Sequence, residues 1–336
     1  MMTPDTGLLR RNKPGEETIL EVVGLKKYFP IRNAWGRQTG DLRAVDDVSL
    51  QVRKGEILGI VGESGCGKST LGKAIMGIQQ PSDGNTVFDG RAITGYGPTQ
   101  ARELRQHLQY AYQDPGASLD PRWKIRRSLH EPLVIHRPEL TRAEREEKVR
   151  AMMRAVGLPT THLDLYPHEI SGGQQRRVGL ARILTLNPSV IILDEPTSGL
   201  DVSVQATILK LFTELQIEFN LTYLFISHDL SVVQMICDRI AVMYLGKIVE
   251  VGETAAVFSN PKHPYTQSLL AAVPKIGGRR VIDDFALEGE PPNPGNLPSG
   301  CRFRTRCPIA QPSCAREQPP LRADWPAQAA ACFLAR

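Results

Sequence analysis

A glycine-rich stretch, GESGCGKS from Gly62 to Ser69, has the spacing G-x-x-x-x-G-K-[ST]. It follows the apolar run EILGIV and precedes the helical pattern TLGKAIMGI. Glycines let backbone N–H groups approach phosphates, and a helix that starts at the loop adds its dipole. In such a loop Lys68 pairs with the β- and γ-phosphates, and the Ser69 hydroxyl ligates Mg²⁺. We expect a nucleotide to contact the following residues: Gly62, Ser64, Gly65, Cys66, Gly67, Lys68, Ser69 and Thr70.

Two adjacent carboxylates end the run VIILDEP, whose apolar residues predict a buried strand. Asp194 and Glu195 would emerge at the carboxyl end of that strand, where α/β sheets bind their ligands. One carboxylate cannot easily hold a metal ion and polarise water at once. We therefore expect Asp194 to hold Mg²⁺ through water and Glu195 to polarise the attacking water, as in phosphoryl transfer. Cys66 is interpreted as a small tolerated residue, with an oxidation-sensitive thiol as the alternative.

The elements that position these residues alternate between strands and helices. Strand-like runs with Gly-marked turns occupy the part after a polar leader at 1–16, and the pattern turns helical from about 100 to 186. TRAEREEKVRAMMRAVGL has a Thr start, acidic residues in its first turn and a Gly near its end. SVIILDEP and LTYLFISHDL suit parallel strands that are buried on both faces. The sequence therefore predicts an α/β sheet with a β-rich layer and a helical insert.

Composition limits the class of protein. The 336 residues carry a formal charge of +5, a mild basic excess that does not indicate a nucleic-acid partner. No apolar run reaches the roughly 18 residues of a membrane-spanning helix, and the first residues lack the apolar core of a signal peptide. We expect a cytosolic chain, in which clustered cysteines serve as metal ligands or redox groups rather than structural disulfides.

Three further motifs, ISGGQQRR, SGLD and ISHD, lie in this order around the carboxylates, and with the phosphate loop they resemble ATP-binding cassette (ABC) ATPases over almost the whole chain. The resemblance implies a P-loop ABC ATPase core of α/β class with an antiparallel β layer and a helical subdomain, followed by a small Cys/Pro-rich C-terminal extension. It also implies ATP and Mg²⁺ as ligands. Serine and two glycines at a helix start would make an anion-binding N-terminus, which agrees with this family's signature motif.

The resemblance assigns further roles. The signature would bind the γ-phosphate of ATP held by the opposite subunit, through Ser171, Gly172, Gly173 and Gln174. Gln113 matches the Q-loop that senses Mg²⁺ and the γ-phosphate, so the Mg²⁺ set becomes Ser69, Gln113 and Asp194. His228 matches the switch histidine and Asp201 the D-loop aspartate. Tyr28 is the candidate for stacking on adenine, with Phe29 or a plain core role as alternatives.

Within the family, YQDPGASLDPR, NPKHPYTQSLLAAVP and the tail resemble oligopeptide and dipeptide importer ATPases of the F type. This implies a heterodimer with a homologous D-type ATPase, two membrane permeases and an extracytoplasmic binding protein, at the cytoplasmic face of the inner membrane. The expected domains are a leader at 1–16, a nucleotide-binding domain at 17–260 and an extension at 261–336. Importers of nickel chelates, opines or sugars remain alternatives, because the ATPase does not touch the cargo.

Four of the six cysteines fall in the tail, at Cys301, Cys307, Cys314 and Cys332. Their spacing lacks the paired C-x-x-C knuckles of structural zinc sites, although four thiolates suit either a Cys₄ zinc site or a cubane cluster. Some relatives carry an iron–sulfur cluster in this extension, so the resemblance favours [4Fe-4S], with zinc or no metal as alternatives. Two other classes stay open: an ABC ATPase of DNA repair, and an iron–sulfur regulatory protein in which ATP is ancillary.

Overall fold

A computed structural model describes residues 17–112, 119–272, 289–325 and 327–335. The chain divides into two compact units. The first unit holds Arg53–Glu56 and Tyr96–Leu224, together with Glu17, and the second holds Thr18–Val52, Ile57–Gly95 and Phe225–Arg336. The predicted domain boundaries at 16/17 and 260/261 follow a different division of the chain and stay predictions.

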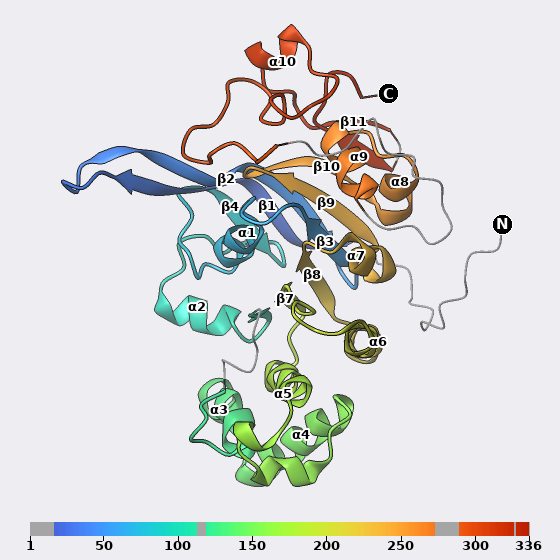
Figure 1. The fold of residues 1–336 in the computed structure, drawn as a ribbon. Coiled ribbons are helices and arrows are strands. Elements are labelled where there is room, and N and C mark those ends of the chain that lie inside the picture. The colour runs from blue at the N-terminus through green and yellow to red at the C-terminus, as the bar shows by residue number, and fades with distance from the viewer. Residues whose placement is uncertain (1–16, 113–118, 273–288, 326, 336) are drawn as a thin grey trace, which may run out of the picture. The chain divides into compact units, whose positions relative to one another are not determined.

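The second unit is built on β-strands and contains the phosphate loop. Its elements are β1 (Thr18–Arg32), β2 (Gln38–Arg53), β3 (Ile57–Val61), α1 (Lys68–Ile75), β4 (Asp83–Phe88), β5 (Arg91–Ala92), α7 (Leu230–Ile236), β9 (Arg239–Tyr244), β10 (Lys247–Glu253), α8 (Thr254–Ser259), α9 (Pro264–Ala271), α10 (Pro312–Arg316), β11 (Arg322–Trp325) and β12 (Gln328–Ala330). Figure 1 shows β1 and β2 as a long hairpin beside β4.

Two sets of paired strands make up this unit. One is a sheet in the order β2-β1-β4-β5, in which β1 runs antiparallel to β4, as expected for the β-rich layer. The other has the order β11-β12-β10-β9-β3, with β3 and β9 parallel and β10 antiparallel to both β9 and β12. Every residue of β3 is buried, because a strand covered on both faces needs a continuous apolar run.

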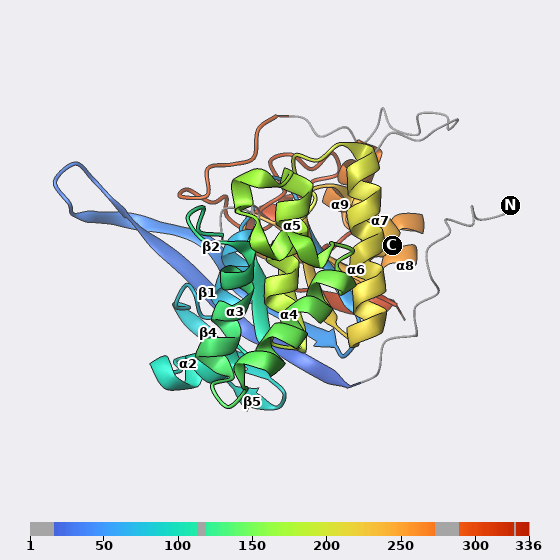
Figure 2. The ribbon, with the colours of Figure 1, turned by 90° about the horizontal axis from the view of Figure 1, so that it is seen from below.

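The first unit contains the helical insert. Its elements are α2 (Pro98–Leu104), β6 (Leu108–Ala111), α3 (Ile125–His136), α4 (Arg142–Ala155), η2 (Thr160–Asp164), η3 (Pro167–Glu169), α5 (Gly172–Leu184), β7 (Val190–Asp194), α6 (Val202–Phe219) and the first half of β8 (Thr222–Ser227). Helices α3, α4 and α5 pack against one another, as Figures 1 and 2 both show. Helices α2, α3, α4 and α5 all lie between residues 98 and 184, with one short strand, β6, among them, while the bounds of the predicted helical subdomain at about 100–186 stay a prediction.

Local sequence explains where these elements begin. Thr141 caps α4, accepting a hydrogen bond from the Glu144 N–H while the Glu144 carboxylate accepts from the Thr141 N–H, which is a capping box. Strand β7 is buried throughout and pairs in parallel with β6, as its apolar run predicted. Among the described helices, none is long and apolar enough to cross a membrane.

Candidate nucleotide site

The phosphate loop connects the buried strand β3 to helix α1. Gly67 precedes the helix with φ of 108°, and a Cβ there would lie 2.0 Å from the carbonyl oxygen of Ala44. A Cβ on Gly62 would lie 2.2 Å from the carbonyl oxygen of Met243. Both positions require glycine, because the backbone packs closely and φ is positive at both. The loop's shape is therefore set by its glycines, as the motif predicted.

Lys68 folds back over the loop. Its Nζ donates to the carbonyl oxygens of Gly62 and Glu63 at 2.8 and 2.9 Å, and the side chain is almost fully buried. Its ammonium group thus lies over the backbone on which the phosphates would sit. Cys66 is buried beside it, and burial raises the pKa of its thiol although Lys68 acts in the opposite direction. A protonated, buried thiol agrees with the interpretation of Cys66 as a small tolerated residue.

His228 follows β8 and is exposed, while Asp229 starts α7. The Asp229 carboxylate accepts hydrogen bonds from the N–H groups of Ser231 and Val232, at 2.8 and 3.3 Å. The cap fixes the direction in which the chain leaves the strand, and it therefore fixes the backbone next to His228. The ISHD motif thus places its histidine at the carboxyl end of a strand, where the α/β rule expects ligand contacts.

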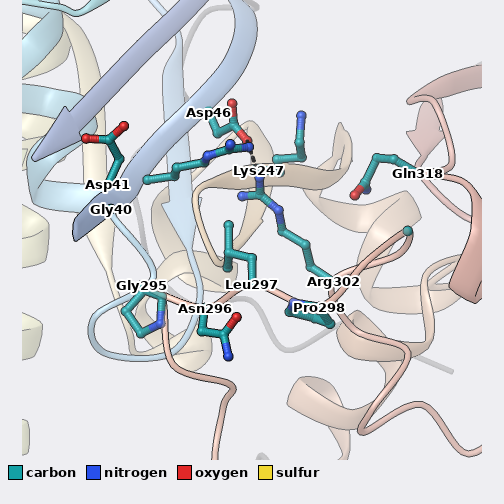
Figure 3. Close-up of a pocket in the computed structure, with 13 residues that line it drawn as sticks. Gly40, Asp41, Asp46, Lys247, Gly295, Asn296, Leu297, Pro298, Arg302 and Gln318 are labelled. Atoms are coloured by element: carbon teal, nitrogen blue, oxygen red, sulfur yellow. Dashed lines mark hydrogen bonds and ion pairs between the residues drawn. The ribbon is translucent and has the colours of Figure 1, made fainter. Parts of the chain in front are cut away.

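Tyr28 does not present a free hydroxyl to solvent. Its Oη donates to Asp46 Oδ1 at 2.5 Å, and the Arg43 guanidinium lies 5.5 Å from the ring centroid. Burial and the bond to Asp46 raise the pKa of Tyr28 to about 12. Asp46 is also bonded to Arg302, whose guanidinium reaches it from the C-terminal segment, as Figure 3 shows. The role of Tyr28 as an adenine-stacking residue stays a prediction.

Asp194 and Glu195 lie in the first unit, at the end of β7. Asp194 is buried and accepts a hydrogen bond from the hydroxyl of Tyr110 on β6, at 2.6 Å. Burial and the neighbouring carboxylate raise the pKa of Tyr110 well above its usual value, so this hydroxyl remains a donor. Glu195 has φ of +48°, which is unusual for a residue with a side chain. Such strain is often found where a functional carboxylate must be aimed in one direction.

The signature motif forms the start of helix α5. Ser171 is the N-cap and accepts from the Gln174 N–H at 3.3 Å, and the Gln174 side chain accepts from the Ser171 N–H at 2.9 Å. A Cβ added at Gly172 or Gly173 would meet no atom within 4 Å, so this helix start is open. The signature thus forms a capped helix N-terminus whose glycines leave room for a ligand to approach the backbone, and its binding of an anion stays a prediction.

Arg176 connects the signature helix to the segment after Glu195. Its guanidinium donates to the carbonyl oxygens of Pro196 and Ser198, at 3.1 and 2.9 Å. The same segment leads to Asp201, an exposed residue that precedes α6. The first unit thus brings the signature, the two carboxylates and the SGLD motif together. Gln113 lies outside the described residues, so its predicted contacts stay a prediction.

The four thiols of the tail belong to the second unit. Burial raises the pKa of Cys301, and the charges of Cys314 and Cys332 add to the rise. Burial likewise raises the pKa of Cys307 to about 11, with contributions from the other three thiols. All four are free cysteines. Within the described ranges, no group of three or more Cys, His, Asp or Glu side chains is arranged to hold a metal ion.

The motifs did not reveal several residues that support them: Tyr110, Arg176, Asp46, Tyr265 and Arg306. The last two contact Glu63 of the phosphate loop, Tyr265 through its hydroxyl and Arg306 through its guanidinium. Tyr110 and Arg176 left a local signal, since one lies in an apolar run shortly before Gln113 and the other in the signature string itself. Two of the pairs join residues far apart in the sequence, Asp46 with Arg302 at 256 residues and Arg306 with Glu63 at 243, so no local pattern pointed to them.

Comparison with known proteins agrees with this geometry. A family model described as ABC transporter matches residues 45–198, and one described as oligopeptide/dipeptide transporter, C-terminal region, matches residues 249–314. The chain is 49% identical over 323 residues to the oligopeptide transport ATP-binding protein AppF of Bacillus subtilis, covering 95% of this chain and 98% of AppF. It is 48% identical over 314 residues to OppF, an oligopeptide transport ATP-binding protein of Escherichia coli, covering 91% and 93%.

A solved structure shares the fold. CbiO1 from Clostridium perfringens, part of the ABC transporter complex CbiONQ, matches with a TM-score of 0.63 and 31% identity over 73% of this chain and 92% of CbiO1. The mixed α/β fold expected from the motifs is thus confirmed. From the shared motifs, the C-terminal match and the near full-length similarity, it follows that this chain belongs to the ABC transporter family, among the ATP-binding proteins of oligopeptide and dipeptide transporters.

Proposed function

We propose that this chain is the ATP-hydrolysing subunit of an importer for dipeptides or oligopeptides. The observation that carries the ATPase part is the position of Lys68, buried and folded over a glycine loop that admits no side chain at Gly62 or Gly67. The peptide part rests on the match of residues 249–314 to the C-terminal region of peptide transporters. That match favours peptides over nickel chelates, opines and sugars, and over a DNA-repair ATPase.

In this proposal the loop holds the phosphates, and Mg²⁺ is held by the hydroxyl of Ser69, by Asp194 and by Gln113. Bound there, the ion neutralises charge on the β- and γ-phosphates. Glu195, which follows β7 with φ of +48°, orients the attacking water and takes its proton. His228 contacts the γ-phosphate. Each unit supplies its own share of these residues.

The signature contributes to the site of another subunit. The open helix start at Ser171, Gly172 and Gly173 donates N–H groups to the γ-phosphate of a nucleotide held by a homologous D-type ATPase. Two permeases and an extracytoplasmic binding protein complete the importer, so the chain works at the cytoplasmic face of the membrane. Closing the two ATPases on ATP and opening them after hydrolysis alternates access to the transport path.

Substitution of Glu195 by Gln tests the ATPase proposal. It removes the group that activates water and leaves the phosphate loop intact. In the complex with permeases and partner ATPase, we expect E195Q to bind ATP with near-normal affinity and to lose at least about a hundredfold in turnover. The control is Glu214→Gln, at a partly exposed position on α6 whose carboxylate pairs with Lys210. Near-normal hydrolysis by E195Q would refute the assignment.

Peptide uptake tests the cargo. Vesicles that contain the complete importer and its binding protein should accumulate a labelled dipeptide or a short oligopeptide in an ATP-dependent manner. They should not accumulate a nickel chelate, an opine or a sugar at the same concentration. Uptake of one of those solutes and not of peptides contradicts the peptide part, while the ATPase part stands.

We further propose that Cys301, Cys307, Cys314 and Cys332 hold an iron–sulfur cluster. Four soft donors within residues 301–332 support it, although among the described residues no group of them is arranged to hold a metal ion. A bound cluster would cross-link four points of a segment that has a small apolar core. Protein purified anaerobically should absorb broadly near 400 nm and contain iron and sulfide. Colourless protein without metal rejects the cluster, and zinc in its place supports the Cys₄ alternative.

A further inference from the structure

An ion pair between Arg306 and Glu63 joins the C-terminal segment to the phosphate loop. Arg306 donates to the two carboxylate oxygens of Glu63, with Nη1–Oε2 at 2.7 Å and Nη2–Oε1 at 3.1 Å. The Arg306 side chain is 5% exposed, and that of Glu63 is 26% exposed. A bidentate pair with little access to water fixes orientation as well as distance. Glu63 is the second residue of the phosphate loop, so the tail is bonded directly to the nucleotide-binding motif.

Glu63 is held at three separate points. Its backbone N–H donates to the hydroxyl of Tyr265 at 2.9 Å, and its carbonyl oxygen accepts from Lys68 Nζ at 2.9 Å. Phosphates that bind Lys68 compete with the second of these bonds. The contacts from Tyr265 and Arg306 are independent of Lys68. They remain available to hold Glu63 when Lys68 binds a nucleotide, as does the bond from the Cys66 N–H to the Glu63 carbonyl oxygen at 3.3 Å.

The residues just before Arg306 are anchored to the second unit. Phe303 is 1% exposed, and its ring centroid lies 5.3 Å from that of Tyr244 and 5.4 Å from that of Tyr265. Arg302 donates to Asp46 and to the carbonyl oxygen of Leu245, and Figure 3 shows it reaching Asp46 from the tail. Arg302 and Phe303 thus anchor the chain three to four residues before Arg306, which favours one position of its guanidinium against Glu63.

Charge gives the pair a second effect. An unpaired carboxylate at Glu63 would stand on the loop that receives a triphosphate, and like charges at such short range repel. Arg306 neutralises this carboxylate. Arg304, two residues earlier on the same segment, instead donates to Ser299 of the tail itself. Arg304 is therefore the natural control for the charge and size of Arg306.

We propose that Arg306 is a positioning residue for ATP binding, which holds Glu63 and so makes the C-terminal segment part of the nucleotide site. The inference rests on the proposed function in one respect, that the phosphate loop of this chain binds ATP. It assigns to the tail a direct role in that binding, separate from any metal that the four thiols hold.

Titration of the purified full-length chain with a fluorescent ATP analogue and Mg²⁺ tests the proposal. We expect Arg306→Gln to weaken binding roughly tenfold, since a lost charged hydrogen bond is worth about this factor. Arg306→Lys keeps the charge without the fork and should recover part of the loss. Arg304→Gln should bind as the parent does. Equal affinities of R306Q and R304Q would overturn the inference.

A double-mutant cycle with Glu63→Gln separates this role from general damage. Since both changes break the same pair, the double variant should bind no more weakly than R306Q alone. If the affinity loss of the double variant equals the product of the losses of R306Q and E63Q, the two residues are not coupled. Melting temperatures are measured for every variant, and if R306Q does not fold, E63Q and R306K provide the comparison. If the parent chain binds no ATP analogue, the proposed function fails; if it binds and R306Q and R306K match it, only the inference fails.

Discussion

The Tyr110 hydroxyl donates to the carboxylate of Asp194 at 2.6 Å, and both side chains are buried. Their strands β6 and β7 run in parallel, with Tyr110 opposite Ile192. In this setting the tyrosine orients one oxygen of the carboxylate, as hydrogen-bond donors behind metal ligands do. The pair therefore connects the packing of the strands to the place where Mg²⁺ is proposed to bind.

Replacement of Tyr110 by Phe tests this connection. We expect the free energy of unfolding to fall by about 1–3 kcal/mol, since a buried carboxylate loses its donor. In the assembled importer, the Mg²⁺ concentration needed for half-maximal hydrolysis should rise several-fold. Chemical denaturation and a Mg²⁺ titration of ATPase activity measure the two effects. Tyr223→Phe is the control, because that hydroxyl donates to the carbonyl oxygen of Phe212 away from the carboxylates; an equal Mg²⁺ shift in both variants would contradict the argument.

Two glycines of the phosphate loop should differ in their tolerance of a side chain. A Cβ at Gly67 would lie 2.0 Å from the carbonyl oxygen of Ala44, whereas one at Gly65 would meet nothing within 4 Å. Both have positive φ, which costs an alanine about 1–2 kcal/mol. G65A should therefore lose only that amount of stability, while G67A should lose more and should abolish binding of the ATP analogue. Thermal unfolding and titration compare them, and an equal loss in both would show that contact with Ala44 is unimportant.

The sequence predicted the local parts of the site well, because each depends on residues close together in the chain. The glycine loop lies between a buried strand and a helix, and Ser171 caps α5, as their spacing required. In the tail, Phe303 buries its ring in a cluster with Tyr244 and Tyr265. That cluster depends on contacts between distant segments, which no period or motif encodes.

Long-range pairs were missed for the same reason. Arg306 and Glu63 are 243 residues apart, and an arginine among several in CRFRTR carries no mark of its partner. The family resemblance instead assigned roles toward ligands and other subunits. The exposure of each residue bears on these roles, since Ser171 is exposed at an open helix start, whereas Asp194 is buried.

Burial of His263 predicts a pH dependence of stability. Its ring is buried, and burial lowers the pKa to about 3, whereas an unfolded chain titrates at about 6.5. Between these values the unfolded state binds the extra proton, so stability is complete above about pH 6.5 and falls with decreasing pH by up to about 1.4 kcal/mol per unit. Burial raises the pKa of Glu250, so its contribution to stability increases as the pH falls, and this contribution is the same in the parent and in the variants compared below.

His263→Asn removes this titration and keeps a side-chain acceptor for the N–H of Tyr265. The drop in the free energy of unfolding between pH 7 and 5 should shrink by about 2 kcal/mol relative to the parent. Denaturation at both pH values measures it. His168→Asn, at an exposed position, is the control for loss of one imidazole. Parallel pH profiles for H263N and the parent would contradict a neutral, buried His263.

Ser171→Ala separates capping from ligand binding. The loss of the cap on α5 should cost about 1 kcal/mol, as should Thr141→Ala at the capping box of α4 in the same unit. If the open start of α5 binds the partner's nucleotide, S171A should also lower hydrolysis by the assembled importer at least about tenfold, since a helix N-terminus stabilises an anion only when its donors are held in place. T141A should hydrolyse ATP normally despite the same loss of stability. Equal activities in the two variants would reduce Ser171 to a helix cap, because α5 is proposed to meet a nucleotide and α4 is not.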